Sequence, residues 1–175
     1  VHLISKKGLK KQDKRTTAIS ESNFNFLKKN IKNLNEKCFW PSKNIELFYE
    51  CNSKNVNFLN LKEEKKNLMY VFENEKIKNI LLKEIKSNKI KILYKNIKNL
   101  SDLKNYELVI LCLGGNSNIY SNIVKKRSIE KDYREKAITG VVKHKIKHLN
   151  TSQFFLNEGP LAILPFSKNH FSFVW

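Results

Sequence analysis

DKRTTAIS, residues 13–20, is the stretch on which the predicted fold depends. An apolar run over residues 1–4 precedes it and is predicted as a strand; residues 6–14 form a polar loop, and a helical pattern follows. The stretch contains Arg15, the only arginine before Arg127. A guanidinium offers a planar fork of donors that suits phosphate or carboxylate, which an ammonium does not. A forked cation where a loop meets a helix therefore indicates a site for a phosphate-bearing cofactor. An ordinary solvated surface charge is the alternative.

Helical and strand patterns alternate after this stretch. Ser20 is a suitable helix N-cap with Glu21 in the first turn, and apolar residues then recur at helical spacing as far as Asn35. A second helical pattern begins at Asn74. Alternating or apolar runs predict strands over residues 45–49, 56–59, 69–72 and 90–94, with a turn over residues 51–55.

The run LVILCL, residues 108–113, is followed by GGNS, residues 114–117. An unbroken apolar run is typical of a strand buried on both faces of a parallel sheet, and we expect Leu113 to be buried. Gly114 permits a close approach of the backbone to a ligand, although a plain turn after a core strand explains it equally. From Tyr133 onward the pattern changes to strands, over residues 137–148, 152–156, 161–166 and 171–175. The predicted fold class is therefore α/β, a mostly parallel part followed by an antiparallel sheet.

Composition limits the classes of function. The chain has 175 residues, about the length of one domain, and a net charge of +18. Its lysines are spread along the whole chain among abundant Asn and Ile, as an AT-rich coding sequence produces, and no basic block stands apart. We therefore expect no nucleic-acid partner. The chain opens and closes on apolar strand patterns, which we interpret as an internal fragment of a longer protein.

No metal site, disulfide framework or membrane span is predicted. The three cysteines include no CxxC pair, which favours a reducing cytosol. His144 and His148 follow a strand pattern, and at ~3.3 Å per residue they would lie ~13 Å apart, too far for one ion. No apolar run is long enough to cross a bilayer.

Four stretches together resemble the flavin-dependent aromatic hydroxylases of ubiquinone biosynthesis, relatives of para-hydroxybenzoate hydroxylase. They are residues 13–20, residues 70–81, residues 108–117, and GPLAILP at residues 159–165 with the FVW of residues 173–175. Their order and spacing cover nearly the whole chain. The family's Gly-x-Gly-x-x-Gly loop would precede Val1, and its later flavin loop would follow Trp175, so the resemblance also implies a fragment that is inactive alone.

The chain departs from the family's pattern at four positions. Ser5 occupies the place of the acid that holds the adenosine ribose, and Leu113 occupies that of the Asp in Asp-Gly. Tyr120 stands for an arginine and Glu135 for the glutamine of a Tyr-x-Gln segment. These departures bear on whether FAD is bound. They leave open a degenerate, non-catalytic hydroxylase-like subunit that is structural or binds a quinone precursor.

The resemblance implies an FAD-dependent monooxygenase that hydroxylates the aromatic ring of a ubiquinone precursor with NAD(P)H and O2. Arg15 would lie near the polar chain of the flavin, and Gly114 would let the backbone approach the cofactor. The implied fold is a Rossmann-like FAD-binding part, residues 1–40 and 69–130, with substrate-side strands at residues 41–68 and a truncated antiparallel substrate sheet at residues 131–175. The partner would be an aromatic, polyprenylated quinone precursor, with peripheral association to the membrane or to a complex of ubiquinone biosynthesis. The location would be cytoplasmic or peripheral to the inner face of the membrane.

Overall fold

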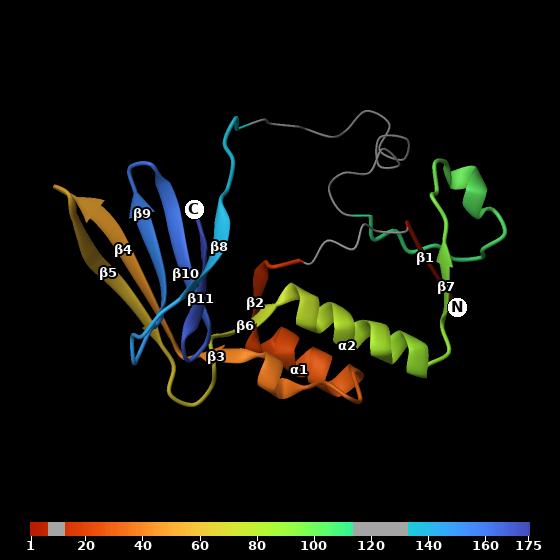
Figure 1. The fold of residues 1–175 in the computed structure, drawn as a ribbon, viewed down its shortest axis with the longest axis horizontal. Helices are drawn as coiled ribbons and strands as arrows, with labels where there is room; N and C mark the ends of the chain where they lie inside the picture. Colours follow the sequence, from red (N-terminus) through yellow and green to blue (C-terminus); the bar gives the residue numbers. More distant parts are fainter. Residues whose placement is uncertain (7–12, 114–132) are drawn as a thin grey trace. The chain divides into compact units, whose positions relative to one another are not determined.

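The computed structural model describes residues 1–6, 13–113 and 133–175 (Figure 1). The chain divides into two compact units. Unit 1 comprises Val1–Lys11 and Ile90–Glu135, and unit 2 comprises Gln12–Lys89 and Lys136–Trp175.

Unit 1 contains a pair of parallel strands, β1 (His2–Ser5) and β7 (Lys91–Tyr94). Its 3-10 helix η2 (Leu100–Leu103) begins with a capping box in which Asn99 and Asp102 bond each other's backbone N–H groups. The buried strand predicted over residues 108–113 is wrong: this segment forms no strand, and Leu108 and Ile110 are 78% and 79% exposed. An apolar run becomes a central strand only when other strands pair with it on both sides, and no described strand pairs with this one.

Unit 2 has a three-stranded antiparallel sheet in the order β2-β6-β3. Its strands are β2 (Thr16–Ser20), β6 (Met69–Glu73) and β3 (Trp40–Ser42). Helix α1 (Glu21–Asn30) follows β2 directly, and Ser20 caps it by accepting a hydrogen bond from the Asn23 N–H, as predicted. The helix ends at Asn30 rather than near residue 35, and the 3-10 helix η1 (Glu36–Cys38) follows. Helix α2 (Asn74–Ser87) begins at the predicted residue.

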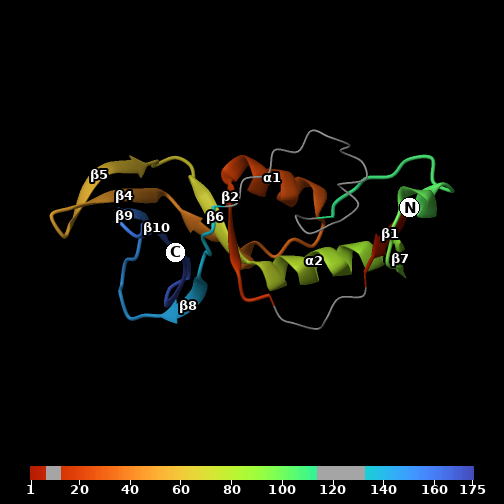
Figure 2. The same cartoon turned by 90° about the horizontal axis from the view of Figure 1, so that it is seen from above.

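The core of unit 2 is aromatic. Phe24 from α1, Phe72 from β6 and Phe39 are all nearly fully buried and pack together. The Phe39 ring centroid lies 5.1 Å from that of Phe24 and 5.0 Å from that of Phe72. Burial of such side chains stabilises a fold by about 1.5–3 kcal/mol each. This cluster anchors α1 to the β2-β6-β3 sheet, and Figure 2 shows α1 and α2 extending from it away from the larger sheet.

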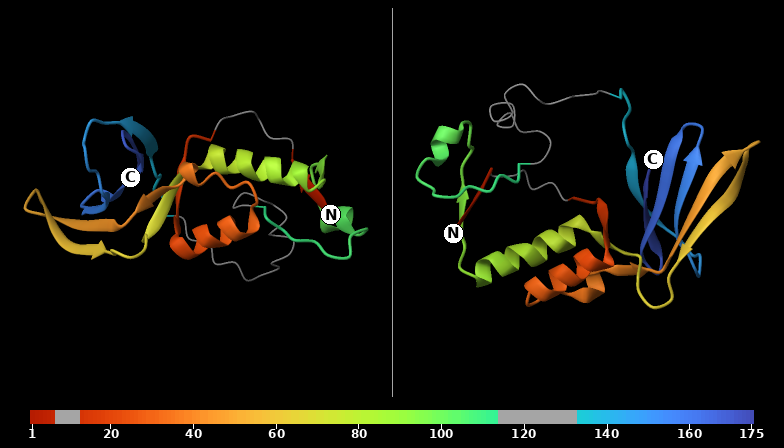
Figure 3. Two further views of the ribbon diagram at one scale, coloured as in Figure 1. Left: turned by 90° about the horizontal axis from the view of Figure 1, so that it is seen from below. Right: turned by 180° about the vertical axis from the view of Figure 1, so that it is seen from behind.

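The larger sheet of unit 2 has six strands in the order β5-β4-β9-β10-β11-β8 (Figure 3). The strands are β4 (Asn44–Cys51), β5 (Lys54–Lys62), β8 (Thr139–Lys143), β9 (Thr151–Leu156), β10 (Gly159–Ser167) and β11 (His170–Val174). The predicted turn over residues 51–55 is confirmed: Asn52 and Ser53 have φ angles of 49° and 58°, the left-handed conformation that a two-residue hairpin turn requires.

The Rossmann-like, mostly parallel α/β class predicted from the sequence is wrong. Strands make up 42% of the described residues and helices 21%, and among the described strand pairs only β1–β7 and β4–β9 are parallel. A parallel sheet needs a helical crossover between consecutive strands. Here β4–β5, β9–β10 and β10–β11 follow each other through short turns, so each pair is antiparallel.

Candidate functional site

Arg15 lies directly before β2 and is held by Asp13. The Arg15 Nε and Nη2 groups donate to the two carboxylate oxygens of Asp13 at 2.9 and 2.8 Å, and the Arg15 backbone N–H donates to Asp13 Oδ1 at 3.0 Å. Two donors of the Arg15 guanidinium therefore bind a carboxylate of the same loop, Asp13. Arg15 was expected where a loop meets a helix, but the strand β2 stands between this loop and α1.

The ion pair changes the acidity of both partners. The hydrogen bonds from the Arg15 side chain and backbone hold the pKa of Asp13 well below its usual range. The hydrogen bond to Asp13 raises the pKa of Arg15. The Arg15 side chain is 68% exposed, so water screens the pair and its contribution to stability is small.

Asn74, the first residue of α2, connects this loop to the helix. Its backbone N–H donates to the Arg15 carbonyl at 3.0 Å, and its Nδ2 donates to Asp13 Oδ2 at 3.3 Å. Its Oδ1 accepts a hydrogen bond of 2.6 Å from the Thr17 hydroxyl. Asn74 thus contacts three residues, Asp13, Arg15 and Thr17, a role that was not predicted from the sequence. An amide at the first position of a helix that follows a strand is the signal that could have found it.

Glu75 adds a second connection between the loop and α2. Its Oε2 accepts a hydrogen bond of 3.3 Å from the Asp13 N–H, and both of its oxygens accept from Lys78 Nζ. The hydrogen bond from Lys78 is the largest cause that lowers the pKa of Glu75. Each of the two carboxylates therefore has a cationic partner, Arg15 for Asp13 in the loop and Lys78 for Glu75 in α2.

Arg15 keeps donors for a ligand. Of the five N–H groups of a guanidinium, two point to Asp13, and no other described residue accepts from the rest. A phosphate oxygen is the acceptor that such a group binds most strongly. Asp13 and Asn74 hold the guanidinium in place, so that little side-chain entropy would be lost on binding.

A hydroxyl pair links the same loop and strand to the larger sheet. The hydroxyls of Thr16 in β2 and Ser172 in β11 are hydrogen bonded to each other. Ser172 is 1% exposed and also donates to the Leu164 carbonyl at 3.5 Å. Burial of a hydroxyl without a hydrogen bond costs free energy, and Ser172 has two partners, the Thr16 hydroxyl and the Leu164 carbonyl. This contact brings the start of β2 next to β11 (His170–Val174).

The other predicted positions belong to unit 1 or lie outside the described residues. Gly114 and Tyr120 lie outside the described residues. Ser5 belongs to unit 1, at the end of β1, where its hydroxyl donates to the Lys6 carbonyl at 3.2 Å. Leu113, also in unit 1, is half-buried, and Glu135 is exposed.

Within residues 1–6, 13–113 and 133–175, no three His, Cys, Asp or Glu side chains are placed to hold one metal ion. His144 and His148 follow the end of β8 and are not part of the longer strand expected over residues 137–148. In the same described ranges, no helix is long and apolar enough to cross a membrane. No protein-family model matches the chain, and no curated protein matches it.

Proposed function

We propose that residues 1–175 belong to an FAD-dependent monooxygenase that hydroxylates the aromatic ring of a ubiquinone precursor, with NAD(P)H and O2. The observation that carries the proposal is the contact, within unit 2, of three stretches that resemble this family. Strand β2 is part of the stretch at residues 13–20. It pairs with β6, which overlaps the stretch at residues 70–81, and Thr16 lies opposite Glu73. Thr16 is also hydrogen bonded to Ser172 in β11. Strand β11 pairs with β10, and β10 contains the third stretch, GPLAILP. Stretches far apart in the sequence thus adjoin one site.

The residues around Arg15 fit a phosphate-bearing cofactor in this proposal. FAD, when bound, would supply the chemistry of the hydroxylation. Arg15 would donate to the polar chain of the flavin through the N–H groups that Asp13 leaves available. Asp13 would keep the guanidinium oriented, and Asn74 would keep Asp13 in place. In this assignment the chain binds and orients the cofactor, and no described side chain is given the role of acid or base.

A specific observation also favours the non-catalytic alternative, a subunit that binds a quinone precursor. Tyr49 in β4, Phe58 in β5 and Phe155 in β9 form an aromatic cluster, with ring centroids 5.8 and 6.0 Å from Phe58, yet they are 42–51% exposed. Exposed apolar patches mark surfaces that bind other molecules. An apolar precursor could bind here without any chemistry.

The two alternatives differ in their dependence on flavin. The purified full-length protein, of which residues 1–175 are part in this proposal, is reconstituted with FAD, and its visible spectrum and its oxidation of NAD(P)H are followed with and without an aromatic precursor. A shifted flavin spectrum with precursor-dependent oxidation supports the monooxygenase. A free-flavin spectrum, together with binding of a prenylated precursor that Phe58→Ser and Phe155→Ser weaken, supports the binding subunit and overturns the monooxygenase.

A further inference from the structure

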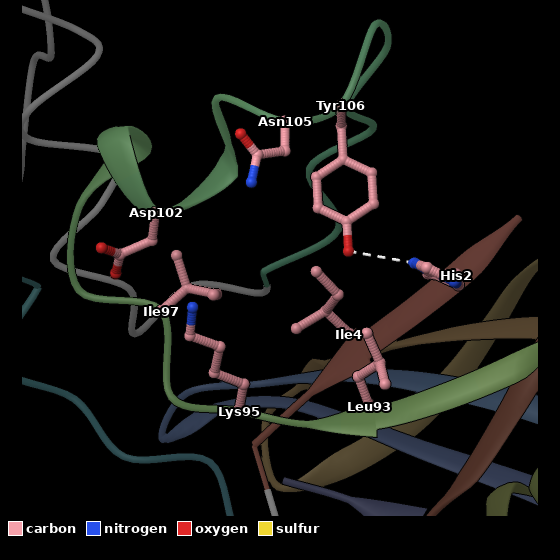
Figure 4. A pocket seen from close by; sticks show the side chains of 8 residues that line it. All are labelled: His2, Ile4, Leu93, Lys95, Ile97, Asp102, Asn105 and Tyr106. Carbon is pink, nitrogen blue, oxygen red and sulfur yellow. Dashed lines mark hydrogen bonds between the residues drawn. The ribbon is translucent and has the colours of Figure 1, made fainter.

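Unit 1 contains an open pocket of about 320 Å³, drawn in Figure 4. It lies between the β1–β7 pair and the chain that follows β7. The volume is at the lower end of the range for small-molecule sites. All of its lining residues belong to unit 1. Neither the resemblance nor the site around Arg15 assigns a role to it.

One side of the pocket is aliphatic. Ile4 in β1 and Leu93 in β7 are paired neighbours and point into the same space, where Ile97 joins them. All three side chains are half-buried, so part of their apolar surface faces the pocket. A ligand that covers this surface removes apolar area from water, which favours binding. This side favours a ligand with an aliphatic body.

A second side is closed by a hydrogen-bonded pair of rings. The Tyr106 hydroxyl lies 3.0 Å from His2 Nδ1, and the two rings meet edge to face at a centroid distance of 5.7 Å. The pair joins β1 to the segment after η2. The two rings therefore form one wall of the pocket, and their hydrogen bond keeps that wall in place.

The charged groups of the pocket are not equivalent. Asp102 Oδ2 accepts hydrogen bonds from the N–H groups of Lys98 and Asn99, at 3.2 and 3.4 Å, and so its charge is used to hold the turn. Lys95 has no ion-pair partner among the described residues. The side-chain amide of Asn105 likewise has no hydrogen bond to a described residue, and Figure 4 shows its nitrogen directed into the pocket, as is the Lys95 ammonium.

We propose that this pocket binds a medium-chain aliphatic carboxylate. The ligand's carboxylate would accept hydrogen bonds from Lys95 Nζ and the Asn105 amide, and its chain would cover Ile4, Leu93 and Ile97. One ammonium and one amide suit a monoanion; a dianionic phosphate would need more donors than the pocket offers. The nearby charge of Asp102 reduces the attraction for an anion, so binding depends on both the charge and the chain.

The test titrates residues 1–175 with octanoate and follows backbone amide resonances by NMR. Octanamide, which has the same chain without the charge, and octan-1-amine, which reverses it, are the matched probes. We expect octanoate to shift the resonances of residues 93–106 saturably, with a Kd of about 1 mM or below. Octanamide should bind at least about tenfold more weakly, the factor that about 1.4 kcal/mol of lost charge-assisted bonding produces.

The variants separate this site from general attraction to a basic chain. Lys95→Gln should weaken octanoate binding about tenfold, whereas Lys95→Arg, which keeps the cation, should retain it. Lys104→Gln removes an exposed lysine of the same unit that does not line the pocket, and it should change nothing. Dispersed spectra of the variants would show that they are folded. Equal binding of octanoate and octanamide, equal effects of the two glutamine variants, or shifts spread over the lysines of both units would each overturn the proposal.

Discussion

Asn74 and Asp13 lie 61 residues apart in the sequence and are joined by an Nδ2–Oδ2 hydrogen bond of 3.3 Å. The bond fastens the loop before β2 to the first residue of α2. Through it the position of the Arg15 guanidinium depends on a helix that begins after another strand.

Asn74→Ala should destabilise the protein by about 1–2 kcal/mol, because two side-chain hydrogen bonds are lost and the Thr17 hydroxyl keeps no acceptor there. The midpoint of urea unfolding measures the change. Asn55→Ala is a matched control on an exposed position of β5 and should have little effect. Equal midpoints for the two variants would show that Asn74 is not a structural connection.

Asp13 should make stability depend on pH in acid. Its pKa is lower in the folded protein than the ~3.9 of an unperturbed Asp, so the stabilisation is present above that value and is lost as the pH falls toward the folded pKa. Asp13→Asn should therefore be less stable than the parent at pH 7, by less than ~1 kcal/mol because the pair is exposed, and the difference should shrink below about pH 4. A difference that grows on acidification would contradict the assigned ion pair.

In the full-length protein, Arg15→Lys should weaken FAD binding although the charge is kept. A guanidinium can bond Asp13 and still present donors to a phosphate, whereas lysine has no such fork. Titration of FAD with each protein gives the dissociation constants. Arg134→Lys, a substitution of the same type in unit 1, is the control and should leave the constant unchanged. Equal constants for Arg15→Lys and the parent would remove Arg15 from the proposed site.

Gly140 in β8 should resist substitution because Phe173 of β11 lies over it. A Cβ at residue 140 would be 2.7 Å from Phe173 Cε1, which is closer than a carbon contact allows. Gly140→Ala should cost about 1–3 kcal/mol in thermal or urea unfolding. The cost should fall in the Phe173→Leu background, since a smaller side chain leaves room. Additive effects of the two substitutions would show that the ring does not cause the cost.

Thr16→Val and Ser172→Ala should each destabilise by about 1 kcal/mol, since each removes the hydrogen bond between the two hydroxyls and Ser172 is buried. The double variant should cost less than the sum of the two single variants, because the shared hydrogen bond is lost only once. A double-mutant cycle by urea unfolding measures the coupling. Zero coupling would mean that the contact between β2 and β11 carries no energy.

Some elements could be predicted from the sequence because their causes lie within a few residues. The Ser20 cap of α1, the start of α2 at Asn74 and the turn at Asn52 depend on local hydrogen bonds and backbone conformation. Strands β4, β5, β6 and β7 were found from their alternating or apolar patterns. Arg15 could be selected as unusual, but the sequence contained no sign that Asp13 occupies its fork.

The rest was decided by which segments meet in the folded chain. Residues 16–20 are a strand because β6 pairs with them, and residues 108–113 are none because no described strand does. The parallel pairing of β4 with β9 joins residues more than a hundred positions apart. A strand is stable only when its backbone groups are bonded to a neighbour, whereas a helix satisfies its own. The sequence by itself therefore determined helices, caps and turns, and only the tertiary structure decided the order of the sheets and the partners of Arg15.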